Sequence, residues 1–163
     1  MYTADFFIKN LNLQPHVEGG YYSEVYRSPL TISDDRYVNG TRNLSTTIYF
    51  LLESGQHSKF HSLKSDEIWF YHCGSAMTIH TIDSDGSLKD IKLGPGINNG
   101  QTPQFVIQAN TIFGAEVDTK DSFSLVSCMV SPGFDFNDFT LYNSDELSKL
   151  YPQHTSLIKR ING

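Results

Sequence analysis

Short stretches rich in aromatic and β-branched residues recur along the chain, and polar turn residues separate them. This pattern is typical of β-strands. It predicts strands at residues 21–27, 43–52, 60–63, 67–73, 77–82, 88–93, 104–109, 111–117 and 123–130. Short strands at such regular spacing favour a sandwich or a barrel, so we predict an all-β fold.

Helical patterns occur only near the two ends of the sequence. Thr3 can cap a short helix in which Phe7 and Leu11, four residues apart, share one face. Ser144 can cap a second helix, which Pro152 stops. We therefore expect a short helix at each end of a β-rich body.

The stretch from Gly55 to Gly74 carries the candidate chemistry. The polar residues 64–66 separate two predicted strands, which indicates an antiparallel hairpin. Side chains alternate between the two faces of a strand. His61 on the first strand and Glu67 at the start of the second can therefore converge.

The spacing of Gly55, His61, Glu67 and Gly74 resembles the first motif of the cupin superfamily, with Leu63 where metal-binding cupins have a second histidine. Five ordered blocks resemble its Cupin_5 family (domain of unknown function 985): residues 14–22, 24–28, 47–52, 60–69 and 131–136. The resemblance implies a double-stranded β-helix, the jelly-roll cupin barrel, with short N- and C-terminal helices. It also implies a single cupin domain over residues 1–163.

His61 and Glu67 each have a structural and a catalytic interpretation. A single histidine on a barrel strand is often held by structural hydrogen bonds, and a carboxylate at a strand start is often solvated. The resemblance instead implies that both face the barrel cavity. An inward imidazole can act as general acid or base. An inward carboxylate must pair with it or have a raised pKa. The candidate catalytic residues are His61 and Glu67, with a tyrosine such as Tyr49 as acid.

A metal site is the alternative use of His61 and Glu67. The usual cupin site takes a further histidine from a second motif, and residues 108–113 match that motif with Phe113 at the histidine position. His57 lies roughly 13 Å along an extended strand from His61, at about 3.3 Å per residue. His72 should face away, which leaves His80 as the open possibility. Two ligands make a weak site, so we expect no metal and no other cofactor.

Candidate ligand-binding residues surround this stretch. Trp69, Tyr71 and Phe113 either pack in the core or form aromatic walls that grip a sugar ring. Arg27 either meets an anionic substrate or bridges to a surface carboxylate.

The charge balance excludes some partners. The chain has 12 Lys and Arg residues against 18 Asp and Glu residues, a formal net charge of −6, and no basic cluster. We expect no nucleic-acid partner. There is no run of roughly 18 apolar residues and no secretion signal at the amino terminus, so we expect a cytoplasmic protein without a membrane partner.

Three functions remain open from the sequence. The first is a metal-independent isomerase or epimerase that acts on a sugar or sugar nucleotide, which resembles the carbohydrate epimerases that share this barrel. The second is a non-catalytic module that binds a small, carbohydrate-like metabolite. The third is a metal-dependent cupin enzyme. Tyr21, Tyr22 and Tyr26 lie on one predicted strand, and tyrosine-rich strands are common at interfaces, so we also expect a homodimer.

Overall fold

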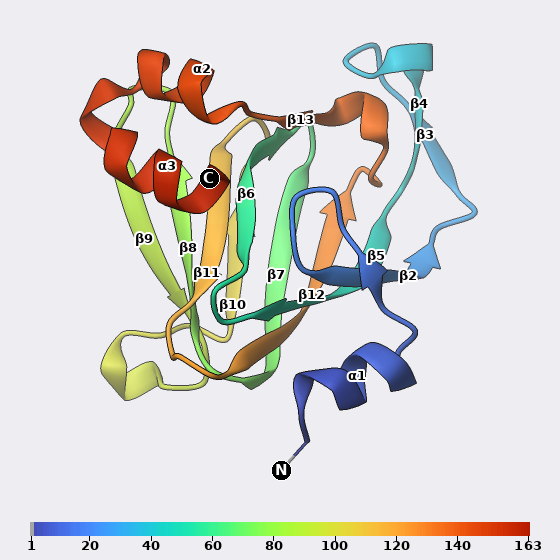
Figure 1. Ribbon diagram of the computed structural model, residues 1–163. Helices are drawn as coiled ribbons and strands as arrows, with labels where there is room; N and C mark the ends of the chain where they lie inside the picture. Colours follow the sequence, from blue (N-terminus) through green and yellow to red (C-terminus); the bar gives the residue numbers. More distant parts are fainter. Residues whose placement is uncertain (1) are drawn as a thin grey trace.

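A computed structural model describes residues 2–163 and shows two antiparallel sheets that face each other (Figure 1). In one sheet the strand order is β1 (Gln14–Pro15), β2 (Tyr21–Arg27), β5 (Thr46–Glu53), β12 (Phe123–Ser131), β7 (Asp66–Gly74) and β10 (Gln104–Ile107). In the other it is β13 (Phe139–Leu141), β6 (His57–Leu63), β11 (Ile112–Val117), β8 (Met77–Ile82) and β9 (Leu88–Leu93). The predicted all-β jelly roll is confirmed.

A small hairpin, β3 (Thr31–Ser33) and β4 (Thr41–Asn43), projects beside the sheets (Figure 1). It splits the predicted strand at residues 43–52, whose second part is β5. The antiparallel pair predicted at 77–82 and 88–93 is confirmed by the continuous register of β8 with β9.

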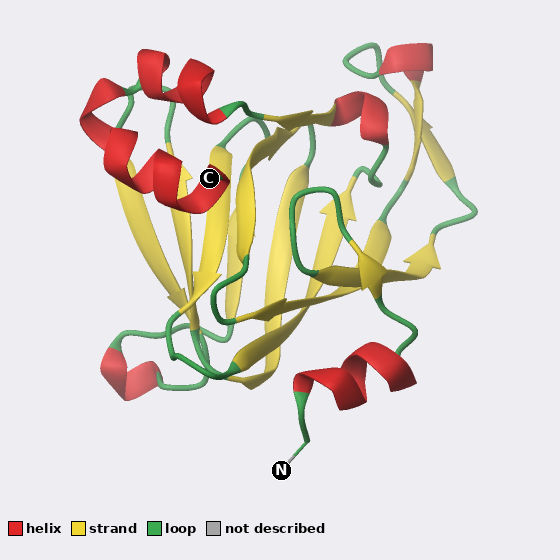
Figure 2. Cartoon of the chain, in the orientation of Figure 1, coloured by secondary structure: helices red, strands yellow, loops and turns green. Residues whose placement is uncertain are grey.

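Short helices lie at both ends of the chain (Figure 2). In α1 (Ala4–Asn10), the Thr3 hydroxyl accepts the Phe6 N–H, as the capping pattern predicts. Asn143, and not Ser144, caps α2 (Ser144–Leu150), because its side-chain oxygen accepts from the first turn. A second carboxy-terminal helix, α3 (Thr155–Asn162), was not predicted. Within residues 2–163, no helix combines the length and apolar character needed to cross a membrane.

The predicted hairpin of β6 with β7 is wrong. β6 pairs with β11 and β13, whereas β7 pairs with β12 and β10, so the turn at Lys64–Ser65 carries the chain from one sheet to the other. Turn residues indicate where a strand ends but not where the next strand finds its partner, which long-range pairing decides. As a result His61 and Glu67 approach each other from facing sheets.

Single strands contribute side chains both to the hydrophobic core and to a cavity. On β5, Ile48 lines a cavity while Leu52 packs in the core; on β7, Glu67 lines the cavity and Trp69 packs in the core. Inward side chains at one end of the sandwich thus fill it, and those at the other end leave a hollow.

Two β-bulges change which side chains point into this hollow. In β2, the register against β5 shifts between Glu24 and Tyr26, so Arg27 lines the cavity together with Glu24. In β6, the register against β11 shifts so that three steps of β6, from Ser58 to His61, match two steps of β11. Residues three apart in a regular strand point to opposite faces, and the extra residue of a bulge reverses this.

Candidate functional site

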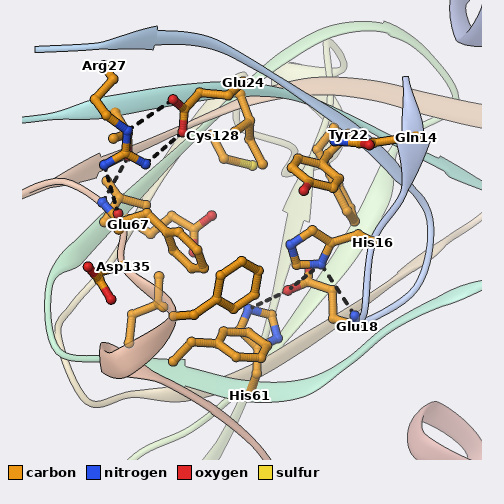
Figure 3. Close-up of a pocket in the computed structure, with 18 residues that line it drawn as sticks. Gln14, His16, Glu18, Tyr22, Glu24, Arg27, His61, Glu67, Cys128 and Asp135 are labelled. Carbon is orange, nitrogen blue, oxygen red and sulfur yellow. Dashed lines mark hydrogen bonds and ion pairs between the residues drawn. The ribbon is translucent and has the colours of Figure 1, made fainter. Parts of the chain in front are cut away.

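The cavity between the sheets has a volume of about 410 Å³ (Figure 3). Its carboxyl groups are Glu18, Glu24, Glu67 and Asp135, and its basic groups are His16, His61 and Arg27. A concave site with a few converging polar groups on an apolar wall is typical of small-molecule binding. This cavity is the candidate functional site.

A tight turn brings His16 and Glu18 into the cavity. The His16 carbonyl accepts the Gly19 N–H, and the Glu18 carbonyl accepts the Lys59 N–H of β6. At Gly19, φ is +113° and a Cβ would lie 2.0 Å from the His57 carbonyl oxygen. Only glycine fits this backbone conformation and this close approach. The turn can therefore press against β6 and place Glu18 beside His61.

Glu18 is the centre of a buried cluster. Its Oε1 accepts a hydrogen bond from the Ser58 hydroxyl at 2.9 Å. Its Oε2 lies 3.3 Å from His61 Nε2 and 3.5 Å from His16 Nδ1. The bulge in β6 makes this possible, because it turns Ser58 and His61 to the same side.

The hydrogen bonds of the two imidazoles define where their protons are. His61 Nδ1 lies 2.6 Å from the Lys59 carbonyl oxygen, which can only accept, so Nδ1 carries a proton and Nε2 faces Glu18. His16 Nδ1 accepts the Glu18 backbone N–H at 3.3 Å, so the proton of neutral His16 is on Nε2. Burial lowers the pKa of both histidines and raises the pKa of Glu18.

One proton must therefore lie between Glu18 and His61. Without it, an Oε2 lone pair of Glu18 would face the Nε2 lone pair of neutral His61 in a buried site, which is repulsive. With it, the pair is uncharged overall, and Oε2 and Nε2 attract each other across 3.3 Å, whichever atom holds the proton. Both His61 nitrogens are then engaged, and this residue has no free nitrogen for a ligand.

Glu67 lies opposite this cluster on β7 and is 6% exposed. Burial raises the pKa of its carboxyl to about 7; attraction to His61 opposes this rise and repulsion from Glu18 adds to it. Near neutral pH, Glu67 therefore exists in both the protonated and the ionised form. A group with this property can both take and give a proton.

His16 presents its free nitrogen to the cavity. Figure 3 shows its ring with Nδ1 directed to Glu18 and the other nitrogen directed into the open space, across from Glu67. The ring is held edge-on between the side chains of Tyr22, Phe50 and Phe139. A hydrogen-bond donor and a titrating carboxyl thus face each other across room for a ligand.

The mouth of the cavity combines charge with aromatic surface. Arg27 forms a bidentate ion pair with Glu24, with Nε–Oε1 at 3.0 Å and Nη2–Oε2 at 2.7 Å. Phe134, Phe136 and Phe139 pack edge to face around one another. Such rings offer a flat apolar wall to the C–H face of a ligand.

The structure brings together three of the residues that the sequence analysis singled out, namely His61, Glu67 and Arg27. Arg27 bridges to Glu24, which is the carboxylate alternative considered for it. Tyr49 does not reach the cavity, because its neighbours Ile48 and Phe50 on β5 face inward and Tyr49 faces outward against His72. The expected pairing of a His61 base with a Tyr49 acid is therefore not possible in this geometry.

Trp69, Tyr71 and Phe113 do not line the cavity either. Trp69 and Phe113 are fully buried in the core, and Tyr71 packs against that core with its hydroxyl donating to the Gly74 carbonyl. Phe113 packs against the His61 ring, with the ring centroids 4.1 Å apart. These aromatic residues belong to the hydrophobic core next to the cavity and do not form its walls.

Two further histidines, His57 and His80, meet at Glu116 outside the cavity. His80 lies between Asp90 and Glu116, and His57 Nε2 is 3.7 Å from Glu116, so neither joins His61. Throughout residues 2–163, no group of three or more His, Cys, Asp or Glu side chains is arranged to hold a metal ion. Of the two replaced ligand positions, Leu63 lines the cavity, whereas Phe113 is buried in the core and pairs with His61 across β6 and β11.

Sequence reasoning did not identify His16, Glu18, Glu24 or Asp135 as site residues. A signal was present, because His16 and Glu18 lie two residues apart directly before Gly19–Gly20, in a block that carried the family resemblance. Paired glycines after polar residues indicate a tight turn. What the turn contacts, however, depends on strands that are distant in the sequence.

Comparisons with known proteins agree with the fold and the motifs. A family model described as Cupin_5, Cupin superfamily (DUF985), matches residues 5–142. An uncharacterised protein of Saccharomyces cerevisiae is 35% identical over 156 residues, which cover 88% of this chain and 77% of the yeast protein.

Solved structures are similar at two levels. A protein from Shewanella oneidensis has a TM-score of 0.91 at 42% identity, covering 100% of this chain and 99% of that one, and a hypothetical protein from Leishmania major has 0.90 at 40%, covering 98% of both. Oxalate decarboxylase from Bacillus subtilis has a TM-score of 0.57 at 12% identity over 90% of this chain and 36% of its own, a likeness of fold alone. The chain belongs to the Cupin_5 family of the cupin superfamily.

Proposed function

We propose that the protein is a metal-independent isomerase or epimerase that moves a proton on a small carbohydrate-like substrate held in the cavity. One observation carries the proposal: the buried Glu67 carboxyl, with a pKa of about 7, faces the Nε2–H group of His16 across an open space. Chemistry next to a carbonyl group needs such a pair, one group to take a proton and one to stabilise the charge that develops.

In the first step, ionised Glu67 takes a proton from the substrate carbon beside the carbonyl group. The C–H electron pair forms a carbon–carbon double bond, and the carbonyl electrons move onto its oxygen. His16 Nε2–H donates a hydrogen bond to that oxygen. A neutral imidazole donor suits this role, because the carbonyl is polarised without prior protonation.

The second step returns a proton and completes the balance. Protonated Glu67 gives its proton to the neighbouring carbon, which was the carbonyl carbon. The oxygen on that carbon takes the proton of His16 Nε2–H, and His16 takes a proton from the adjacent hydroxyl, which becomes the new carbonyl; this interconverts an aldose and a ketose. Alternatively, His16 Nε2–H gives its proton to the original carbon from the opposite side, which inverts that centre, and Glu67 passes its own proton back to solvent as His16 is reprotonated. The two outcomes differ in which group lies nearer the accepting carbon.

His61 acts as a positioning residue in this scheme and not as the base. Its Nδ1–H donates to the Lys59 carbonyl and its Nε2 shares a proton with Glu18. Glu18 in turn holds His16 through its backbone N–H. Holding the base or donor by a further group is the usual way to fix its tautomer and direction.

Leu63 and Phe113 support the metal-independent part of the proposal. Both are hydrocarbon side chains at positions where metal-binding cupins have histidines, and Phe113 packs directly on the His61 ring. Hydrocarbon offers no ligand atom, and of the two imidazoles that line the cavity only His16 has a free nitrogen, its Nε2.

Solvent hydrogen exchange tests the proposal without knowledge of the physiological substrate. A panel of neutral aldoses and ketoses is incubated with the protein in D₂O, and loss of the C–H signal beside the carbonyl is followed by NMR. We expect exchange with at least one sugar, and loss of that exchange in Glu67→Gln. The matched control is Glu53→Gln, which removes a carboxylate on β5 outside the cavity.

Binding without exchange across the whole panel would refute the catalytic proposal and would favour a carbohydrate-binding module instead. Exchange that survives in Glu67→Gln would remove Glu67 from the role of base. Loss of exchange in both Glu67→Gln and Glu53→Gln would mean that the substitutions disturb the structure in general, and it would not support Glu67 as the base.

A further inference from the structure

Arg27 is the one Lys or Arg side chain among the residues that line the cavity within the described chain. A guanidinium presents five N–H donors in a planar fork that matches a phosphate or a carboxylate. An arginine at the mouth of a sugar site would ordinarily indicate a phosphorylated ligand. Here its donors are already in use.

Glu24 occupies the fork itself. Its two oxygens accept from Arg27 Nε at 3.0 Å and Nη2 at 2.7 Å. Arg27 Nη1 donates to Asn43 Oδ1 at 2.9 Å and to the Phe134 carbonyl at 3.1 Å. Four of the five donors therefore have partners from three separate segments, and no bidentate edge faces the cavity.

The β2 bulge builds this pair. Glu24 and Arg27 are three residues apart and would point to opposite faces of a regular strand, but the register shift between Glu24 and Tyr26 turns both to the cavity. Each side chain is about 40% exposed, so the pair stands at the mouth and not in the core.

The remaining charges at the mouth are negative. The pKa of Asp135 is lowered by hydrogen bonds from the Asn137 backbone and side chain, and Asp135 lies close enough to attract Arg27. Deeper in the cavity, Glu18 and His61 form a pair that is neutral overall, while Glu67 is partly ionised. With Arg27 neutralised by Glu24, the carboxylates of Asp135 and Glu67 repel an entering dianion, and no unpaired basic side chain at the mouth of the described chain offsets this repulsion.

We propose that Glu24 is the specificity-determining residue that makes the cavity reject phosphorylated ligands, so that the substrate class is an uncharged carbohydrate and not a sugar phosphate or a sugar nucleotide. Hydroxyl groups of a neutral sugar can donate to Asp135 and Glu67, and the C–H face of the ring can lie on Phe134, Phe136 and Phe139. This inference uses the cavity of the proposed function as the binding site, but it does not depend on proton transfer there.

Inorganic phosphate is the probe that tests it, through calorimetry and ³¹P NMR titration near neutral pH. The native protein is expected to show no saturable binding at millimolar phosphate. Glu24→Gln keeps the shape of the side chain, removes its charge and frees the guanidinium fork, so phosphate affinity should rise by roughly tenfold or more. Adding Arg27→Gln to this variant should abolish the gain.

Asp135→Asn is the matched control, because it removes one negative charge from the same mouth and leaves the Glu24–Arg27 pair intact; asparagine also retains a side-chain oxygen for the Asn137 N–H. Equal gains in Asp135→Asn and Glu24→Gln would overturn the proposal in favour of a general charge effect. Tight phosphate binding by the native protein, or no gain in a folded Glu24→Gln variant, would also overturn it. Each of these titrations measures equilibrium binding of phosphate and not catalysis. Their outcome therefore does not depend on whether the hydrogen-exchange test succeeds.

Discussion

The buried carboxyl of Glu67 should make the native protein less stable as the pH rises, and Glu67→Gln should remove that dependence. The pKa of Glu67 is raised from the ordinary value of 4.5 to about 7, chiefly because burial disfavours the ionised form. The folded state therefore holds this proton more tightly than the unfolded state. Between these two pH values the unfolded chain binds fewer protons, so the free energy of unfolding falls as the pH rises.

The magnitude follows from the two pKa values. Each pH unit in the window from 4.5 to about 7 costs about 1.4 kcal/mol, so ionising Glu67 removes roughly 3 kcal/mol of unfolding free energy by pH 8. Below pH 4.5 the penalty is absent, because the carboxyl is protonated in both states. A neutral glutamine of nearly the same shape should therefore match the native protein at pH 4 and exceed it by roughly 3 kcal/mol at pH 8.

Urea unfolding from pH 4 to pH 8.5 measures this difference, with the fluorescence of Trp69, the one tryptophan in the sequence and fully buried, as the signal. Circular dichroism provides a second probe that is independent of the neighbourhood of Glu67. Glu18 also has a raised pKa, but it is present in both proteins, so the difference between their curves reports Glu67 together with its interactions with Glu18 and His61. Glu53→Gln controls for the loss of one negative charge.

A stability difference that stays constant from pH 4.5 to pH 8 would refute the reasoning. So would a native protein that is more stable than Glu67→Gln at pH 8. Either result would mean that Glu67 is solvated or fully paired in solution, and it would remove the main support for Glu67 as the base.

Three further predictions follow from the same structure. Leu63→His combined with Phe113→His should create a Zn²⁺ site beside His61, in which Zn²⁺ displaces the proton between Glu18 and His61 Nε2; equal calorimetric affinity in the native protein and the double variant would contradict the motif alignment. Gly19→Ala should lower the unfolding free energy by on the order of 2 to 4 kcal/mol, because its Cβ would meet a backbone oxygen; an unchanged denaturation midpoint would count against this. The protein should be a homodimer, because among residues 2–163 strand β1 covers only the first two residues of the outer edge of β2; a light-scattering mass near 18.4 kDa would exclude it.

The local pattern of the sequence was sufficient for the nine longer strands and for one of the two helix caps. Alternation of apolar and polar residues, turn residues and capping side chains act over a few positions, so they can be read without knowledge of the partner. The motif spacing around His61 and Glu67 was likewise sufficient to place both residues in the cavity. For Tyr49, the same alternation along β5 already indicates the outer face once Ile48 is known to point inward.

Only the tertiary structure decided how these pieces meet. The link between β6 and β7 has the residues of a hairpin turn, yet it crosses between sheets, because the pairing edges of both strands are taken by strands distant in the sequence. The bulges that turn Ser58 toward Glu18 and Arg27 toward Glu24 arise from register between strands, which leaves no local signal. The sequence by itself therefore determined the fold class, the family and the cavity positions of His61 and Glu67, and it offered Arg27 as a further candidate. The proton-sharing cluster around Glu18 and the blocked fork of Arg27 depend on contacts between segments that only folding brings together.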